Sequence, residues 1–196
     1  MSFSAPAFPH NSNPSIAMTI CAVDDVTPGL AADALRRSCQ KMRFDRALLV
    51  SSSRPEALAD GIEHIKISPI RSRDEYSRFI LHDLHHHIET SHVLVVQWDG
   101  FVLDGSAWDE TFTTYDYIGA VWAWHAEHRV GNGGFSLRSR KLLKAVAQIA
   151  PQQMNGIGED EFICRLFATR LENEFGITFA PEAVAHRFAY ERVLSH

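Results

Sequence analysis

The sequence has few cysteines, no long apolar run and no excess of positive charge, and each lack excludes a class of protein. Its three cysteines, Cys21, Cys39 and Cys164, are odd in number and far apart, which argues against a disulfide framework and against a cysteine-based zinc site. Nowhere do about 18 apolar residues follow one another, so no transmembrane helix is expected. The N-terminus lacks the charged and apolar regions of a signal peptide. We therefore expect a cytoplasmic protein, with peripheral membrane contact left open.

The composition is that of an ordinary globular domain. The chain has 196 residues, of which 45% are hydrophobic and 22% charged, which is close to the average for soluble domains. The net charge of -5 lacks the electrostatic footprint of a nucleic-acid binder. Residues 1–15 are rich in Ser, Pro and Asn and have no periodicity, so we expect a flexible tail there and one folded domain over residues 16–196.

Strands alternate with helices along the chain. Apolar runs predict strands at residues 16–23, 46–51, 62–67, 93–100 and 177–180, and helical spacing predicts helices from residue 27 to about 39 and at residues 74–88, 108–112, 138–149 and 159–174. The segment 115–124 is strand or loop. This alternation predicts an α/β fold with a mostly parallel central sheet flanked by helices.

Asp99 follows the most apolar of these strands, at the edge where open α/β sheets bind their ligands. A carboxylate there can hold a hard cation, and the cation can hold a phosphate. Because side chains alternate along a strand, Gln97 and Asp99 are expected to point the same way. That is the geometry of an Asp-x-Asp metal motif with an amide in the first place. The alternative is a turn residue that bonds its own backbone.

Two further segments carry candidate site residues. In the Gly131-Asn132-Gly133-Gly134 run, glycines let a ligand approach the backbone, and Arg138 at the start of the predicted helix is suited to a phosphate or a sugar hydroxyl. A plain tight loop is the alternative. Glu159 and Asp160 open the last helix, where acidic residues complement the helix dipole. One of them is a candidate general base if this helix start faces the same cleft as Asp99.

The histidines at 82, 85, 86, 87 and 92 also invite a metal interpretation, since imidazoles at helical spacing can share a zinc ion. No glutamate follows them in a zinc-protease pattern. An exposed His-rich helix face is the favoured interpretation.

Four segments together are more specific than any one of them. They are Val-Leu-Val-Val-Gln-Trp-Asp-Gly-Phe at 93–101, Tyr-Asp-Tyr-Ile-Gly-Ala-Val-Trp at 115–122, Gly-Asn-Gly-Gly-Phe-Ser-Leu-Arg-Ser at 131–139 and Gly-Glu-Asp at 158–160. Their order and spacing resemble a family of glycosyltransferase-like domains, compact members of the GT-A glycosyltransferases, over about residues 18–191. The resemblance implies inverting transfer of a sugar from a nucleotide-sugar donor to a saccharide or glycolipid acceptor, with Mn²⁺ or Mg²⁺.

The resemblance also implies roles for single residues. Asp99 takes the place of the last Asp of the Asp-x-Asp motif and contacts the metal, and His186 is the candidate for a further metal ligand. Asp160 matches the base that deprotonates the acceptor, with Glu159 beside it. The remaining positions implied to bind the donor are Asp24 or Asp25 at the nucleoside, and Gln97, Gly133, Gly134 and Arg138.

Three functions remain open at this point. Gln97 departs from a full Asp-x-Asp motif, which motivates a non-catalytic carbohydrate-binding or regulatory module as the alternative to a transferase. A nucleotidyltransferase is the third, but no glycine-rich, lysine-containing phosphate loop follows the first strand. Trp122 and Trp124 are expected either to stack on an acceptor sugar or to belong to the core.

Overall fold

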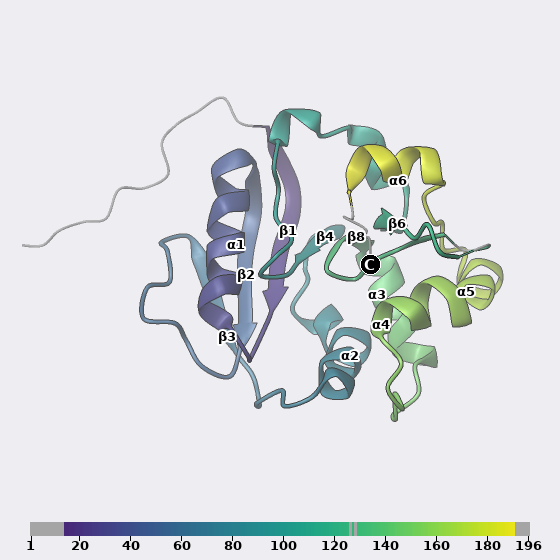
Figure 1. The fold of residues 1–196 in the computed structure, drawn as a ribbon, viewed down its shortest axis with the longest axis horizontal. Helices are drawn as coiled ribbons and strands as arrows, with labels where there is room; N and C mark the ends of the chain where they lie inside the picture. Colours follow the sequence, from purple (N-terminus) through teal and green to yellow (C-terminus); the bar gives the residue numbers. More distant parts are fainter. Residues whose placement is uncertain (1–13, 126, 128, 191–196) are drawn as a thin grey trace, which may run out of the picture.

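A six-stranded sheet in the order β3-β2-β1-β4-β8-β5 forms the centre of the computed structural model, which describes residues 14–125, 127 and 129–190 (Figure 1). Its strands are β1 (Ser15–Val23), β2 (Arg43–Ser51), β3 (Ile62–Lys66), β4 (His92–Val96), β5 (Tyr117–Ile118) and β8 (Phe135–Ser139). The first four run parallel, and β8 pairs antiparallel with both β4 and β5. The α/β fold with a mostly parallel sheet is confirmed. The expected N-terminal tail falls largely on residues 1–13, outside the described residues.

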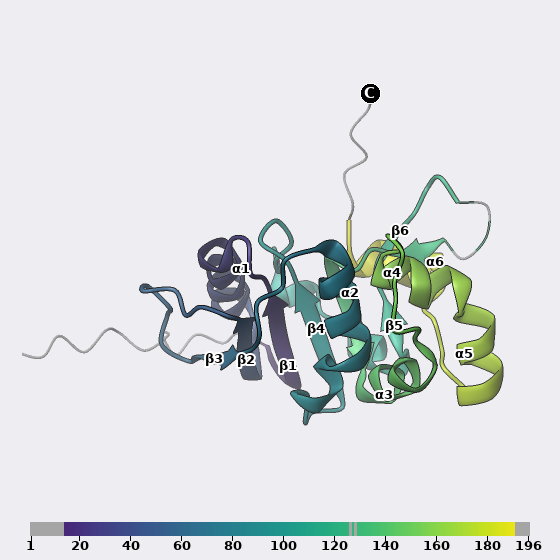
Figure 2. The same ribbon diagram turned by 90° about the horizontal axis from the view of Figure 1, so that it is seen from below.

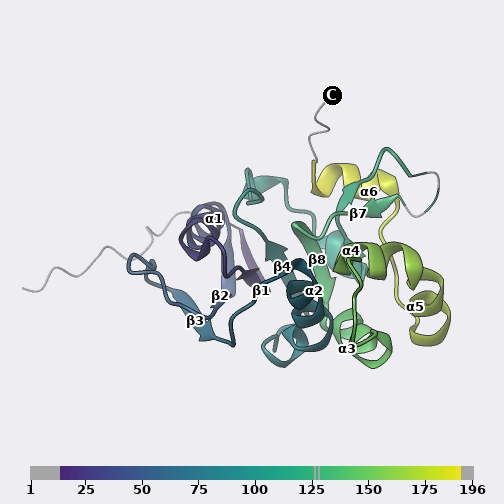
Figure 3. The same cartoon turned by 60° about the horizontal axis from the view of Figure 1, so that its bottom comes forward.

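Helices cover both faces of this sheet (Figures 2 and 3). They are α1 (Pro28–Lys41), α2 (Arg73–His82), α3 (Arg140–Ile149), α4 (Glu159–Glu161), α5 (Ala168–Phe175) and α6 (Glu182–Phe188). Short 3₁₀ helices lie at Leu84–His86, Gly105–Ala107 and Glu110–Thr114, and β6 (Ala120–Val121) pairs with β7 (Val130–Gly131) in a separate ribbon. No helix among the described residues is both long enough and apolar enough to span a membrane.

Alternation along β1 explains the two covered faces. Ile20 belongs to a core cluster with Leu35 of α1, whereas Cys21 belongs to a second cluster with Phe79 of α2 and Leu143 of α3. Successive residues of a strand point to opposite faces, so a strand that is apolar at every position needs a helix layer on each side. The three cysteines are free thiols, and two of them are buried.

Several elements end earlier or later than their sequence pattern predicts. β4 stops at Val96, and residues 97–100 form a turn in which the Gly100 N–H donates to the Gln97 carbonyl at 3.1 Å. Gln97 and Asp99 are therefore not alternate residues of one strand, and the geometry inferred from the pleat is wrong. α2 ends at His82 rather than at Ile88.

The last two predicted helices also differ from their patterns. α3 begins at Arg140, because the Ser139 hydroxyl caps it by accepting from the Leu142 N–H at 2.9 Å. Arg138 is consequently a strand residue and not the first residue of a helix. The final helix is interrupted by a π-helical turn, Phe162–Leu166, between α4 and α5. In place of the strand expected at residues 177–180, an isolated bridge joins Tyr117 to Phe179.

The Asp116 side chain connects three segments of the chain that are distant in sequence. Its carboxylate accepts from the Ser139 hydroxyl at 2.6 Å, and from the Thr178 N–H at 2.9 Å and hydroxyl at 3.1 Å. The side chain thereby links the start of β5 to the start of α3 and to the segment after α5. Burial alone would raise the pKa of Asp116, but these donors and Lys141 outweigh it, so the pKa lies below its ordinary value.

We expect Asp116→Asn to lower the free energy of unfolding at pH 7 by about 1.5–3 kcal/mol, because the side chain loses one of its two acceptor oxygens and the negative charge that strengthens these hydrogen bonds. A depressed folded-state pKa stabilises above the unfolded-state pKa, and that contribution disappears as the pH falls through the folded value. The difference between wild type and variant should therefore shrink below about pH 4. Urea unfolding from pH 7 to pH 3 measures it, with Asp60→Asn, at an exposed residue, as the control. A difference that does not change with pH would contradict this role.

Candidate functional site

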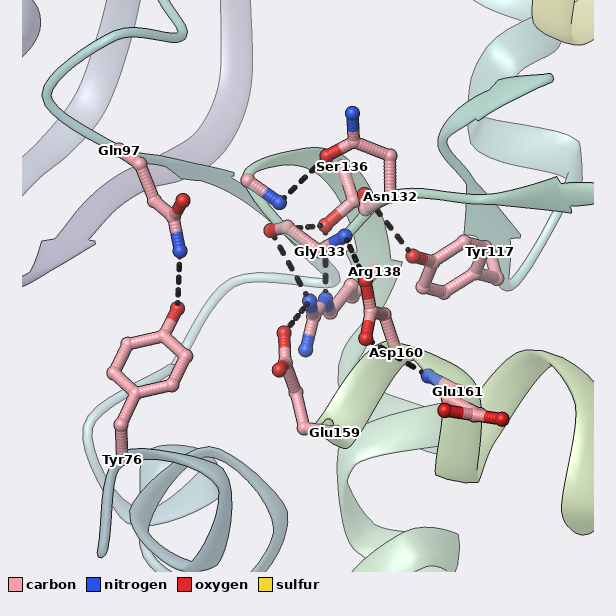
Figure 4. Close-up of polar contacts among 11 residues, drawn as sticks. Tyr76, Gln97, Tyr117, Asn132, Gly133, Ser136, Arg138, Glu159, Asp160 and Glu161 are labelled. Atoms are coloured by element: carbon pink, nitrogen blue, oxygen red, sulfur yellow. Dashed lines mark hydrogen bonds and ion pairs between the residues drawn. The ribbon is translucent and has the colours of Figure 1, made fainter. Parts of the chain in front are cut away.

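A polar cavity of about 270 Å³ opens where the glycine-rich loop, the turn after β4 and the first residues of α2 and α4 meet. Figure 4 shows the polar contacts around it. The lining residues are Arg73, Tyr76, Gln97, Trp122, Asn132, Gly133, Gly134, Glu159 and Asp160. A larger, shallower hollow of about 440 Å³ lies along α3 and Phe175, but it contains none of the predicted site residues. The smaller cavity is therefore the candidate site.

The glycine-rich loop has its shape because two of its positions exclude a side chain. A Cβ on Gly133 would lie 2.0 Å from Glu159 Oε1, and one on Gly134 would lie 2.8 Å from Gln97 Oε1. Between them and β7, Asn132 adopts a left-handed conformation with φ of 65°, and its Oδ1 accepts from the Gly134 N–H at 2.8 Å. Asparagine tolerates this conformation better than most residues. The loop backbone therefore lies in close contact with the Glu159 carboxylate and the Gln97 amide.

A buried ion pair supports the loop from beneath. Arg138 Nη2 lies 3.0 Å from Glu159 Oε1, with side-chain exposures of 0% and 7%. The guanidinium also donates to the Gly133 carbonyl at 3.3 Å and to the Ser136 hydroxyl at 2.9 Å. Burial raises the pKa of Glu159, while the adjacent guanidinium opposes that shift. Arg138 does not itself line the cavity, so it can reach a ligand only through the groups that it holds in place.

Asp160 is the carboxylate best placed for chemistry in the cavity. Its Oδ2 accepts from the Gly133 N–H at 3.1 Å and its Oδ1 accepts from the Glu161 N–H at 2.8 Å. An ionised carboxylate has about four acceptor positions, so lone pairs remain for a ligand. The two backbone donors fix the orientation of the carboxylate relative to the loop. Asp160 thus presents a carboxylate of fixed orientation at the wall of a polar cavity.

Tyr76 and Gln97 form the opposite wall in Figure 4, joined by a hydrogen bond from Gln97 Nε2 to the Tyr76 hydroxyl at 3.3 Å. Burial raises the pKa of Tyr76, so the phenol keeps its proton at neutral pH and can donate it. The sequence places Tyr76 only within the helix predicted at residues 74–88. No local signal distinguishes it from a core residue, because its role depends on where α2 meets the turn after β4.

The aromatic residues after β6 divide between core and surface. Trp122 is buried and also lines the cavity, and a Cβ on Gly131 would lie 2.3 Å from its ring. Trp124 is 57% exposed, and the two ring centroids are 6.3 Å apart. The expectation of a core residue is thus confirmed for Trp122, and stacking on an acceptor sugar stays a prediction.

The remaining predicted site residues lie outside the cavity. Asp99 is exposed in the turn after β4, and His186 is exposed on α6; neither lines the cavity. Asp24 accepts from the backbone N–H groups of Val26 and Thr27 at 2.8 and 2.7 Å. It is therefore a turn residue ahead of α1.

Asp25 is also engaged by backbone. Its two oxygens accept from the N–H groups of Ser52 and Ile70, both at 2.6 Å. Burial alone would raise the pKa of Asp25, but these two donors outweigh it and hold the pKa below its ordinary value. The carboxylate joins the loops that follow β1, β2 and β3, at the edge of the sheet where a nucleoside was expected.

The donor set for a metal ion does not fit the expectation of Mn²⁺ or Mg²⁺. Among residues 14–125, 127 and 129–190, no three His, Cys, Asp or Glu side chains come together as ligands of a metal ion. Hard cations require several oxygen ligands at once. The two predicted ligands, Asp99 and His186, do not share the cavity with Asp160.

Comparison with known proteins relates this architecture to sugar-transferring enzymes. A family model described as "Protein of unknown function (DUF5672)" matches residues 61–196. No curated protein matches the sequence.

Among solved structures, the mannosyltransferase PcManGT from Pyrobaculum calidifontis, in complex with GDP-Man and Mn²⁺, has a TM-score of 0.56 at 12% identity, over 85% of this chain and 55% of that one. The glycosyltransferase GlyE of Streptococcus pneumoniae has a TM-score of 0.52 at 12% identity, over 86% and 46%. The galactosyltransferase LgtC, in complex with donor and acceptor sugar analogues, has a TM-score of 0.50 at 14% identity, over 83% and 73%. The chain thus spans about half the length of the first two, and at these identities the likeness shows the GT-A fold alone.

Proposed function

Since the chain belongs to the DUF5672 family and has the GT-A fold, we propose that it is a glycosyltransferase that moves a sugar from a nucleotide-sugar donor to a hydroxyl group of a saccharide or glycolipid acceptor. The observation that carries the proposal is the position of Asp160. Its carboxylate lines a polar cavity beside the glycine-rich loop, with its orientation fixed by the Gly133 N–H.

Asp160 acts as the general base in this proposal. It accepts the proton of the acceptor hydroxyl while the hydroxyl oxygen bonds to the anomeric carbon of the donor sugar. The bond between that carbon and the diphosphate oxygen breaks, and its electron pair leaves with the nucleoside diphosphate. Attack opposite to the leaving group inverts the configuration. Glu159 remains paired with Arg138 and contributes by holding the loop.

The other lining groups support a sugar as the ligand. The Tyr76 hydroxyl has a proton to donate, the Asn132 amide nitrogen lies beside the loop, and Gln97 Oε1 is an acceptor. A sugar presents hydroxyls that both donate and accept, together with an apolar face that suits an aromatic ring such as that of Trp122. Few pockets for apolar ligands combine so many polar groups.

The second candidate function is a carbohydrate-binding or regulatory module on the same fold. It is favoured by Gln97, an amide where the Asp-x-Asp motif has a carboxylate, and by the absence of a metal donor set among the described residues. Such a module would bind a sugar and would not bind a nucleotide.

A donor screen separates the two candidates. We expect uridine, guanosine, cytidine or thymidine diphosphate, or one of their sugar conjugates, to raise Tm, because a ligand at 100 times its Kd stabilises the folded state by about 2.7 kcal/mol. Thermal unfolding with each nucleotide, with and without Mn²⁺ or Mg²⁺, measures this. A Tm that rises with free sugars and with none of the nucleotides would favour the binding module and contradict the transferase.

A further inference from the structure

Arg73 is a cationic side chain in the cavity to which nothing above assigns a role. It is the first full residue after the Ser72 cap of α2 and lines the cavity. Within the described part of the chain, its side chain takes part in no hydrogen bond and no ion pair. Its Nη2 lies 2.6 Å from the position that a Cβ on Gly158 would take, and Asp160 Oδ1 lies 2.7 Å from the same point. The guanidinium is therefore held close to the proposed base without being paired to it.

The charges around the cavity leave Arg73 available to an anion. The Glu159 carboxylate is already compensated by the buried Arg138 guanidinium. The backbone N–H groups of Gly133 and Gly134 in the loop are not free to bind an anion. They already donate to the side chains of Asp160 and Asn132. Positive charge for an anionic ligand must therefore come from a side chain, and Arg73 is the cationic residue of the lining.

A nucleotide-sugar donor brings such an anion. Its diphosphate is charged on binding and gains charge as the glycosidic bond breaks, so a cation must stand beside it. In the PcManGT complex the cation present is Mn²⁺, whereas the described residues of this chain offer no group of ligands for one. We propose, on the basis of the function proposed above, that Arg73 binds the donor diphosphate and that nucleotide binding requires no divalent cation.

The side-chain chemistry suits this role. A guanidinium binds two phosphate oxygens at once through parallel N–H groups and stays charged at any physiological pH. Tyr76, one helical turn further along α2, offers a hydroxyl proton to the same ligand. Arg73 is exposed, so its replacement removes no buried packing. Its loss should change ligand binding and leave folding intact.

Isothermal titration of GDP and UDP into four proteins, wild type, Arg73→Ala, Arg73→Lys and Arg78→Ala, tests the proposal, each with EDTA and again with MnCl₂. Arg78 is the matched control, an exposed arginine of the same helix that does not line the cavity. We expect wild type to bind one of the nucleotides equally well in both buffers. Arg73→Ala should weaken binding about 10- to 100-fold, as expected for the loss of charged hydrogen bonds. Arg73→Lys should retain part of the affinity, and Arg78→Ala all of it.

Two results would overturn the inference and leave the transferase in place. One is nucleotide binding that appears only with MnCl₂, and the other is an Arg73→Ala affinity equal to that of wild type. If wild type binds neither nucleotide in either buffer, the nucleotide-sugar donor itself is refuted for these two bases, and the role of Arg73 falls with it. The three results differ in the wild-type titrations or in the Arg73→Ala titration, so each failure is identified separately.

Discussion

Replacing Asp160 with asparagine is expected to lower kcat about 100- to 10,000-fold, the range in which a positioned general base contributes to a reaction. Asparagine has nearly the same shape, and its amide oxygen can still accept from the Gly133 N–H that Asp160 now binds. What the variant loses is the ability to take the proton of the acceptor hydroxyl. The loss should therefore fall mainly on turnover, with little change in donor affinity, and Tm should fall only by the loss of the hydrogen bond from the Glu161 N–H, which an amide nitrogen cannot accept.

The matched control for Asp160→Asn is Glu161→Gln, which removes a carboxylate from the neighbouring position, outside the cavity lining. Sugar transfer should be measured with the donor found in the thermal screen, and donor affinity by titration on the same samples. Turnover by Asp160→Asn equal to that of wild type would end the assignment of the base. A fall in Tm that leaves the variant partly unfolded at the assay temperature would instead indicate a structural role.

Replacing Arg138 with leucine is expected to lower the free energy of unfolding by about 3–5 kcal/mol, because it leaves the buried Glu159 carboxylate without its counter-ion. The variant also removes the hydrogen bonds to the Gly133 carbonyl and to the Ser136 hydroxyl. Arg138 Nη1 is itself buried without a hydrogen-bond partner among the described residues. The substitution also removes this unsatisfied donor, which partly offsets the loss of stability. The glycine-rich loop should lose order together with stability.

Urea unfolding at pH 7 measures this effect against Arg165→Leu. Arg165 Nη1 lies 3.5 Å from Glu161 Oε1 in an ion pair that is 38% and 46% exposed, and exposed pairs contribute about 0–1 kcal/mol. The double variant Arg138→Leu/Glu159→Leu should recover stability relative to Arg138→Leu, since no buried charge remains unpaired. Equal losses for Arg138→Leu and Arg165→Leu would show that the buried pair has no special weight.

The sequence predicts the layers of the fold better than the ends of its elements. Apolar periodicity locates β1, β2, β3 and β4 and the helices between them, because a strand covered on both faces leaves a strong local signal. The end of β4 depends on a turn that closes between Gln97 and Gly100, and no apolar pattern records it. Arg138 looks like a surface residue at the start of a helix because its partner, Glu159, comes from a distant part of the chain.

The same limit applies to the candidate site. Motif resemblance points to the glycine-rich loop and to Asp160, and the structure brings these into one cavity. Asp24 is a turn residue outside the cavity lining. A short carboxylate that follows a strand readily accepts from the next backbone N–H groups. No motif in the sequence indicates that Arg73 belongs to the site. Its position follows from the packing of α2 against α4, which is a property of the tertiary fold.

Because β1 lies in the middle of the sheet, the domain cannot be truncated beyond this strand without exposing its neighbours. The family match begins at residue 61, yet β1 lies between β2 and β4 in the sheet and pairs with β4 from Thr19 to Ala22. A fragment trimmed to the matched region would keep every cavity-lining residue and would expose the whole hydrogen-bonding edge of β4. Bare edges of apolar strands recruit other chains. The region matched by the family model is therefore a poor unit for expression, and a stable fragment needs the strand that the match leaves out.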